Sequence, residues 1–247
     1  MLHRKSVLLG VGLLFSSWVA LAAEPNWSSY QSVLSHVKPG SKNGVPLMVV
    51  DYAAIKADGS LDKAYQALSV FKLDGLSSRE EKLAFYINAY NILALKMVAD
   101  HWPTQSIKDV GSLISPVWDK PVGELGGKSV SLGQVEHKIL RPMGEPRIHL
   151  AIVCASVSCP DLRNEPYTAA QLDKQLDDQA KSFLDNPAKG LKADKDILHV
   201  SQIFEWFEKD FATQGGVKGF IKNHKADAPD LEIKTDIPYD WAVNGVN

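Results

Sequence analysis

The most constraining feature of this sequence is a long apolar stretch, Leu83 to Val98, in which Asn88, Asn91 and Lys96 are the strongly polar residues. Ser77-Ser78-Arg79-Glu80, just before it, has the capping-box spacing, in which a hydroxyl and a carboxylate satisfy the amides at a helix start. A helix that is apolar nearly all the way round is buried inside a domain. The stretch therefore predicts a central buried helix whose two asparagines lie inside.

Shorter predicted helices and strands surround this helix. Apolar runs of strand length alternate with amphipathic segments, and no internal repeat or Ser/Gly linker divides the chain. We predict a single compact domain with a buried central helix, a small β-sheet and surrounding helices. The expected elements are a helix from Trp27 to Val37 ended by Pro39-Gly40, an apolar run from Val45 to Tyr52, a surface segment with a hairpin from Thr104 to Lys128, a capping box from Ser131 to Gln134 that starts a short helix from Val135 to Leu140, a buried strand within Arg147 to Cys154, a helix from the capping box at Thr168 to Gln171 as far as Leu184, a strand from Ile197 to Ser201, and a helix from Ile203 to Phe211.

The first 22 residues have the pattern of a cleavable export signal. Positive residues at 3–5 precede an apolar run from Val7 to Val19, and small residues follow up to Ala22. The run is shorter than the about 20 residues that a transmembrane helix needs. We expect cleavage after Ala22, a periplasmic or secreted protein, and no integral membrane segment after cleavage. Residues 23–76 then form a lead-in segment packed on the domain.

Composition and motifs narrow the classes of function. The net charge of −2, without a Lys/Arg cluster longer than two residues, argues against nucleic acid as a partner. The patterns G-x-S-x-G, G-x-G-x-x-G, Walker A and H-E-x-x-H do not occur, and no cofactor is indicated. A zinc site built from His137, His149, Cys154 and Cys159 is chemically conceivable, but the spacing does not support it. We therefore predict no metal and no cofactor.

Several short motifs follow one another along the chain in a characteristic order. They are Phe85-Tyr86-Ile87-Asn88-Ala89-Tyr90-Asn91, Val135-Glu136-His137-Lys138-Ile139-Leu140-Arg141, Pro146-Arg147-Ile148-His149, Cys154-Ala155-Ser156-Val157-Ser158-Cys159-Pro160, Tyr167-Thr168, Ile203-Phe204-Glu205-Trp206-Phe207 and Tyr239-Asp240-Trp241. Together they resemble the domain of unknown function family 547, and the resemblance covers most of the chain from about Leu83 onward. It implies a single α+β domain, here residues 77–247, found in exported bacterial proteins and in plant proteins, with no established activity.

A polar centre is predicted around Glu136 and His137. Helical spacing places Glu136 on an apolar stripe, where a carboxylate needs a partner, and Arg141 and Arg147 are the available cations. Glu136 is therefore either half of a structural ion pair or a site acid or base. His137 is the first candidate for a proton shuttle, because imidazole titrates near neutral pH. We expect His149, by contrast, to be a core or edge residue.

The two cysteines of the loop from Cys154 to Cys159 form a disulfide, include a nucleophile, or are inert thiols. In an exported protein, two cysteines at this spacing favour a disulfide. The alternative is a thiolate nucleophile that His137 activates and Asn88 orients. Ser158 in the same loop is a second candidate nucleophile, or a turn serine.

Two functions remain open at this point. In the first, the protein is a hydrolase or acyl-transfer enzyme with His137 as general base, Glu136 and Asn88 as orienting groups, and Ser158 or a cysteine as nucleophile. In the second, it is a non-catalytic binding or interaction domain whose polar network is structural. A small molecule or a peptide is the expected ligand. Its predicted binding residues are Asn91, Arg141 and Arg147, and we expect both asparagines to contact the Glu136 helix and the Ser158 loop.

Overall fold

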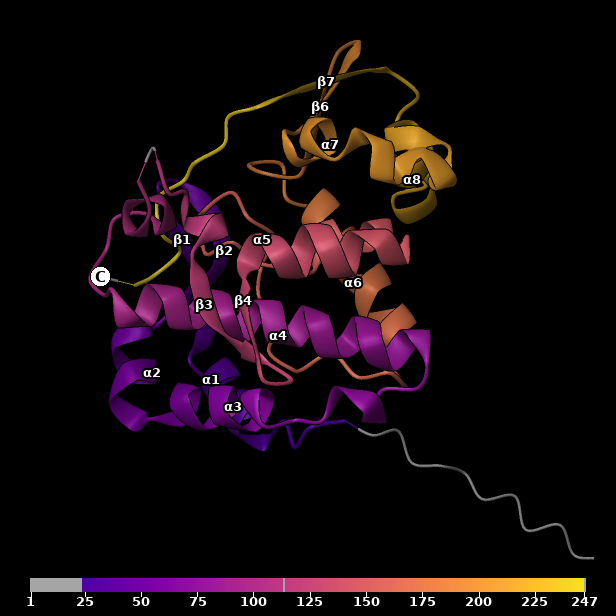
Figure 1. Cartoon of the computed structure of the whole chain (residues 1–247). Coiled ribbons are helices and arrows are strands. Elements are labelled where there is room, and N and C mark those ends of the chain that lie inside the picture. Colours follow the sequence, from indigo (N-terminus) through magenta and orange to yellow (C-terminus); the bar gives the residue numbers. More distant parts are fainter. Residues whose placement is uncertain (1–23, 113, 247) are drawn as a thin grey trace, which may run out of the picture.

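The computed structural model describes residues 24–112 and 114–246, so the predicted signal at residues 1–22 lies outside the described residues. Within the described ranges the chain is an α+β fold, as predicted, with helices packed around one long central helix (Figure 1). The strands form three separate small sheets there, where the sequence predicted one. No helix in this part of the chain has the length and apolar character needed to cross a membrane.

Helix α4, Arg79–Asp100, is the predicted central helix and lies in the main hydrophobic core. Its capping box uses Ser78 and Glu81, one residue later than predicted. The Glu81 carboxylate accepts hydrogen bonds from the N–H groups of Ser77 and Ser78, and the Ser78 hydroxyl accepts from the N–H of Glu81. Asn88 and Asn91 are buried, which confirms the expectation drawn from the apolar stretch.

The segment before α4 packs against this core. The prediction that Pro39 and Gly40 end the first helix is wrong. They lie inside strand β1, where they pair with Met48 and Leu47. Proline is tolerated there because each strand of a two-stranded sheet is an edge strand. The elements are α1 (Ser28–Leu34), β1 (Val37–Lys42), β2 (Val45–Val50), α2 (Tyr52–Asp58), α3 (Ser60–Ser69) and a 3₁₀ turn (Leu73–Gly75).

The segment after α4 contains the predicted hairpin and the predicted second capping box. Strands β3 (Pro121–Leu125) and β4 (Lys128–Ser131) pair across Gly126-Gly127, whose positive φ angles of 56° and 74° suit glycine. Ser131 and Gln134 cap α5 (Leu132–Gln134). The helix continues as a π-helical turn, Val135–Leu140, a geometry that occurs frequently at functional sites. Two 3₁₀ turns, Ile107–Val110 and Val117–Asp119, precede the hairpin.

The predicted buried strand within Arg147 to Cys154 is wrong. This segment is a 3₁₀ turn, Pro146–Leu150, followed by irregular backbone, and it comes after another 3₁₀ turn, Arg141–Met143. The Asn91 amide donates to the carbonyl of Ala151 and accepts from the N–H of Val153, so one side chain takes the place of a neighbouring strand. An apolar run indicates burial, but it does not distinguish a buried strand from another buried segment.

The C-terminal elements enclose a second hydrophobic core. Strand β6 pairs antiparallel with β5 and parallel with β7. Two helix boundaries differ from the prediction. Helix α6 starts without a capping box, because the Gln175 side chain accepts the hydrogen bond from the N–H of Thr168. The helix that begins at Ile203 ends before Phe207. The elements are α6 (Leu172–Leu184), β5 (Leu191–Asp194), β6 (Ile197–Ser201), α7 (Ile203–Trp206), a 3₁₀ turn (Glu208–Gln214), α8 (Gly216–His224) and β7 (Glu232–Ile237).

After β7 the chain returns from the second core to the main core. Figure 1 shows this tail in yellow, running from the C-terminal elements back to the region of β1 and α2. Single backbone bridges hold it, pairing Ser156 with Val243 and Val50 with Gly245. The side chain of Val243 is buried in the main core. The tail therefore passes between the two cores, where the candidate site lies.

Candidate functional site

A cavity of about 230 Å³ lies where the two cores meet. Its wall combines residues from α4, the π-helical turn, the cysteine loop, α7 and the tail, so distant parts of the sequence build it together. The lining residues are Tyr90, Trp118, Glu136, His137, His149, Ile152, Cys154, Cys159, Pro160, Ile203, Trp206, Phe207, Tyr239 and Trp241.

Aromatic rings form much of the wall. Trp206, Tyr239 and Trp241 pack on one another with ring centroids 4.5 to 5.7 Å apart. Tyr239 and Trp241 are two positions apart in the irregular segment that follows β7, and their rings lie against each other. The ammonium group of Lys108 lies 3.4 Å from the centroid of a Trp241 ring, a cation–π contact.

Glu136 is the acidic group of the cavity. Its side chain is buried, and burial raises its pKa to about 7, with Arg141 and a hydrogen bond from Tyr90 opposing the rise. The ion pair with an arginine, one of the two roles expected for Glu136, is not formed: Arg141 bonds to Asp210, and Arg147 bonds to Glu145. Glu136 therefore changes protonation state near neutral pH, within a largely aromatic wall.

Asp210 organises the side of the cavity next to Glu136. Arg141 donates to both of its carboxylate oxygens, at 2.6 and 3.0 Å, and Nε2 of His149 lies 2.8 Å from Oδ2. The His149 ring stacks on Phe207 with centroids 3.9 Å apart. Burial lowers the pKa of His149 to about 4, so the ring is neutral at pH 7 and Nε2 donates to Asp210. Its Nδ1 is then a buried acceptor, with no hydrogen-bond partner among the described residues.

His137 lies at the exposed rim of the cavity. Its Nδ1 is 3.3 Å from Nη1 of Arg141, which is always a donor, so this imidazole accepts and is neutral. Partial desolvation and then the Arg141 charge lower its pKa. His137 and His149 share the wall, but in the part of the chain that the structure describes no group of three or more His, Cys, Asp or Glu side chains could hold a metal ion.

Cys154 and Cys159 form a disulfide in the cavity wall, in agreement with the first interpretation of their spacing. A disulfide carries no thiolate, so neither sulfur is a nucleophile in this state. The Tyr239 hydroxyl lies 3.3 Å from each sulfur. The disulfide is therefore part of the cavity and is hydrogen-bonded to its aromatic wall.

Three of the predicted site residues bind the backbone and are not among the lining residues. Asn88 donates to the carbonyl of Tyr167 and accepts from its N–H, while Asn91 bridges Ala151 and Val153. The expected contacts of both asparagines with the Glu136 helix and the Ser158 loop are thus replaced by these backbone contacts. The Ser158 hydroxyl accepts from the N–H of Asp240 and is 2% exposed, so it anchors the tail.

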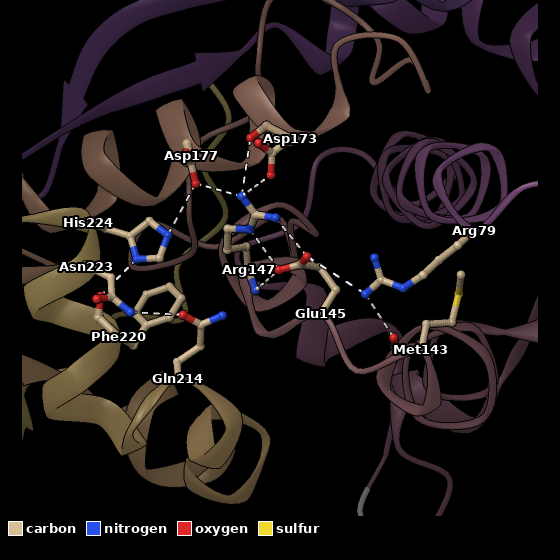
Figure 2. Close-up of polar contacts among 10 residues, drawn as sticks. All are labelled: Arg79, Met143, Glu145, Arg147, Asp173, Asp177, Gln214, Phe220, Asn223 and His224. Carbon is tan, nitrogen blue, oxygen red and sulfur yellow. Dashed lines mark hydrogen bonds and ion pairs between the residues drawn. The ribbon is translucent and has the colours of Figure 1, made fainter.

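Arg147 lies in a separate ionic cluster (Figure 2). Its guanidinium donates to both carboxylate oxygens of Glu145 and to Asp177, with a further bond to Asp173. Asp177 also lies 3.4 Å from Nε2 of His224, which connects α6 to α8. Figure 2 shows Arg147 enclosed by these carboxylates, so its contacts join elements of the fold.

A family model matches one segment of the chain. Residues 73–184 match the model of the family described as "Protein of unknown function, DUF547". This segment is a DUF547-like domain. No curated protein and no solved structure matches the chain. The DUF547-like segment contains Glu136, His137 and the disulfide, whereas α7 and the aromatic tail lie beyond the match.

Sequence reasoning missed part of the wall around the DUF547-like segment. It assigned no role to Trp118, to Asp210 or to the aromatic residues of α7 and the tail. The resemblance drawn from the sequence included the motifs Ile203 to Phe207 and Tyr239 to Trp241, and their clustered aromatic residues are the signal that could have drawn attention to them. The pairing of Asp210 with Arg141, 69 positions earlier in the sequence, left no local pattern.

Proposed function

We propose that the cavity binds a small organic molecule and that Glu136 exchanges a proton with it or with a bound water. The observation that carries this proposal is the buried Glu136 carboxyl, whose pKa of about 7 suits a general base at neutral pH. Among the described residues it has no ion-pair partner within 4.0 Å that would hold it in one state. Aromatic walls suit a ligand with an apolar or ring-shaped body.

The reaction class that we propose is hydrolysis or acyl transfer. The oxygen of a water molecule attacks the acyl carbon and Glu136 takes one proton of that water. The bond from the acyl carbon to the leaving oxygen or nitrogen then breaks, and the alcohol or amine departs with the proton that Glu136 took. The position of His137 at the rim supports a role for it as the second proton-transfer group. Water is the favoured nucleophile because the Ser158 hydroxyl is held by the Asp240 amide and both cysteines are in the disulfide.

Ester hydrolysis tests this proposal. With 4-nitrophenyl acetate as the probe, we expect a protein-dependent rate that rises as the pH increases through about 7, since the base must be deprotonated. Glu136→Gln should lower this rate by roughly 10²-fold. Glu124→Gln is the matched control, because Glu124 is an exposed glutamate outside the cavity. Equal rates for the two variants would refute Glu136 as the base.

A second candidate is ligand binding without catalysis, and one contact favours it. Lys108 already places an ammonium group on the Trp241 ring, so these rings attract cations. An organic cation would bind with its positive charge next to the Glu136 carboxylate and its apolar part against the aromatic wall. Titration with benzyltrimethylammonium, followed by tryptophan fluorescence, should then saturate for the native protein, while Glu136→Gln binds more weakly. Saturation together with the absence of ester hydrolysis would favour this second function.

We also propose that the protein is exported to the periplasm or beyond. The pattern of residues 1–22 and the disulfide both support this, since disulfides persist in oxidising compartments. The intact mass of the protein recovered from the periplasm or medium should correspond to a chain that begins at Ala23. A chain that retains its first residues would contradict this processing.

A further inference from the structure

The disulfide between Cys154 and Cys159 lies in the wall of the cavity, where a small molecule can reach it. Both cysteines line the cavity, and they differ in access: Cys154 is half-buried, whereas Cys159 is 3% exposed. Cys154 is therefore the more accessible residue of the two, and we expect an entering thiolate to attack its sulfur. Thiol–disulfide exchange depends on which sulfur is attacked and on how readily the other sulfur leaves.

The surroundings of Cys159 favour its departure as a thiolate. Its sulfur accepts a hydrogen bond of 2.9 Å from the backbone N–H of Cys154, and the Tyr239 hydroxyl lies 3.3 Å away. The Ser156 hydroxyl donates to the Tyr239 oxygen at 3.4 Å and lies 3.2 Å from the Cys154 sulfur. The Tyr239 hydroxyl is equally close to both sulfurs, so the bond that Cys159 alone receives is the one from the backbone N–H of Cys154. Hydrogen bonds to a charged group are stronger than those to a neutral one, so both donors stabilise the thiolate more than the disulfide.

We propose that the Cys154–Cys159 bond is a redox centre that oxidises small-molecule thiols bound in the cavity. The cavity volume of about 230 Å³ suits a ligand of the size of an aminothiol rather than a protein surface. This activity is separate from the proposed ester hydrolysis, since it uses the two sulfurs and not a bound water.

The chemistry balances in two steps. The sulfur of a first thiolate bonds to Sγ of Cys154, the Sγ–Sγ bond breaks, and its electron pair remains on Cys159. The sulfur of a second thiolate attacks the first thiol's sulfur, and the bond from that sulfur to Cys154 breaks. The products are the small-molecule disulfide, which is the oxidised form, and a reduced protein dithiol. The two protons lost by the thiols reside on Cys154 and Cys159, and the Glu136 carboxylate is available in the same cavity to hold one in transit.

Reduction in glutathione buffers tests the proposal on the folded mature protein. Samples are equilibrated with defined ratios of reduced to oxidised glutathione. Free thiols are then alkylated with N-ethylmaleimide, and the mass of the intact protein is measured by mass spectrometry. We expect a dithiol form that gains two maleimide groups in buffers where a purely structural disulfide stays oxidised. A disulfide that is alkylated only after denaturation would overturn the proposal.

Variants test the direction of attack and the leaving group. Cys159→Ser should form a mixed disulfide with oxidised glutathione at Cys154 at least tenfold faster than Cys154→Ser forms one at Cys159. Tyr239→Phe retains the disulfide and should slow reduction by roughly tenfold, the effect of losing one hydrogen bond to a thiolate. Tyr86→Phe, which lies outside the cavity lining, is the matched control and should react like the native protein.

These outcomes separate the redox centre from the proposed function. Loss of ester hydrolysis in Glu136→Gln, with glutathione exchange intact, would leave the redox proposal standing. Equal reduction rates for Tyr239→Phe and Tyr86→Phe would refute the role of the Tyr239 hydroxyl in thiolate stabilisation. Reduction by thioredoxin but not by glutathione or cysteine would overturn the assignment to small-molecule thiols.

Discussion

At the scale of single residues, Glu136 and His149 show how burial sets protonation in this cavity. Burial raises the pKa of Glu136 to about 7 and lowers that of His149 to about 4, because in each case it disfavours the charged form. Both groups are therefore neutral in mildly acidic solution. Glu136 alone gains charge as the pH rises through neutrality, which makes it the titrating group of the pair.

The stability of the fold should depend on pH through Glu136. Its folded pKa of about 7 lies above the ordinary value of 4.5, so between these two values the unfolded chain binds fewer protons than the native state. Stability is then full below pH 4.5 and is lost as the pH rises through 7, by about 3 kcal/mol in total.

Urea unfolding at pH 5 and pH 8 checks this. Glu136→Gln should gain stability relative to the native protein at pH 8 and little at pH 5, because glutamine does not ionise. Glu124→Gln, in which an exposed glutamate is replaced, should follow the native protein at both pH values. A constant difference between Glu136→Gln and native protein across this range would contradict the raised pKa.

At the scale of elements, Asn91 explains why an irregular segment can be buried beside α4. Its amide satisfies the carbonyl of Ala151 and the N–H of Val153, which a neighbouring strand would otherwise pair. Asn91→Leu should leave both groups unpaired, at about 1 to 3 kcal/mol each. Asn223→Ala is the control, since the bond of that asparagine to Gln214 is on the surface. Urea unfolding of the two variants measures the difference, and similar midpoints would argue against this role of Asn91.

The Arg147 cluster provides a second test at this scale. Arg147 is paired with the buried carboxylate of Glu145, and its removal leaves that charge without its closest partner. We expect Arg147→Met to destabilise the protein by about 3 kcal/mol and to loosen α6. Adding Glu145→Gln should restore part of this loss.

The exposed pair of Lys218 with Asp230 supplies the comparison for Arg147. Both of its side chains are mostly in solvent, at 64% and 76% exposure, so Lys218→Met should change the unfolding midpoint very little. Thermal unfolding of the two methionine variants measures the contrast. Equal effects would show that burial does not distinguish the two ion pairs.

The elements also show what the sequence could predict. The capping boxes at Ser78 and Ser131 involve neighbours in sequence, and the sequence located the second one correctly and the first within one residue. The burial of Asn88 and Asn91 followed from the apolar residues around them. Their partners did not follow, because these are backbone atoms 60 to 79 positions away that any residue type could supply.

At the scale of the whole molecule, the candidate site depends on chain topology. The sequence located Glu136, His137 and the disulfide, which lie near one another along the chain. Tyr239 and Trp241 reach the same cavity only because the tail returns from the second core to the first. No local pattern encodes this return, and the fold was needed to join the two parts of the site.

We expect the tail to belong to the same cooperative unit as the main core. Val243 is 2% exposed within the main core, and the Tyr52 hydroxyl donates to Asn244 at 2.8 Å. A chain that ends at Ile237 should unfold at lower urea concentration, with roughly 2 kcal/mol or more lost from the burial of Val243 alone. It should also bind the dye 1-anilinonaphthalene-8-sulfonate, because removal of Tyr239 and Trp241 opens the aromatic wall.

A point variant separates loss of packing from loss of chain. Val243→Ala should lower stability while leaving the aromatic wall closed, so the urea midpoint falls without dye binding. Val70→Ala, at a side chain that is 71% exposed, is the matched control and should resemble the native protein. If the chain ending at Ile237 keeps the native urea midpoint, the tail is not part of the cooperative unit. In that case the DUF547-like domain would have to hold Glu136 and the disulfide in place without it.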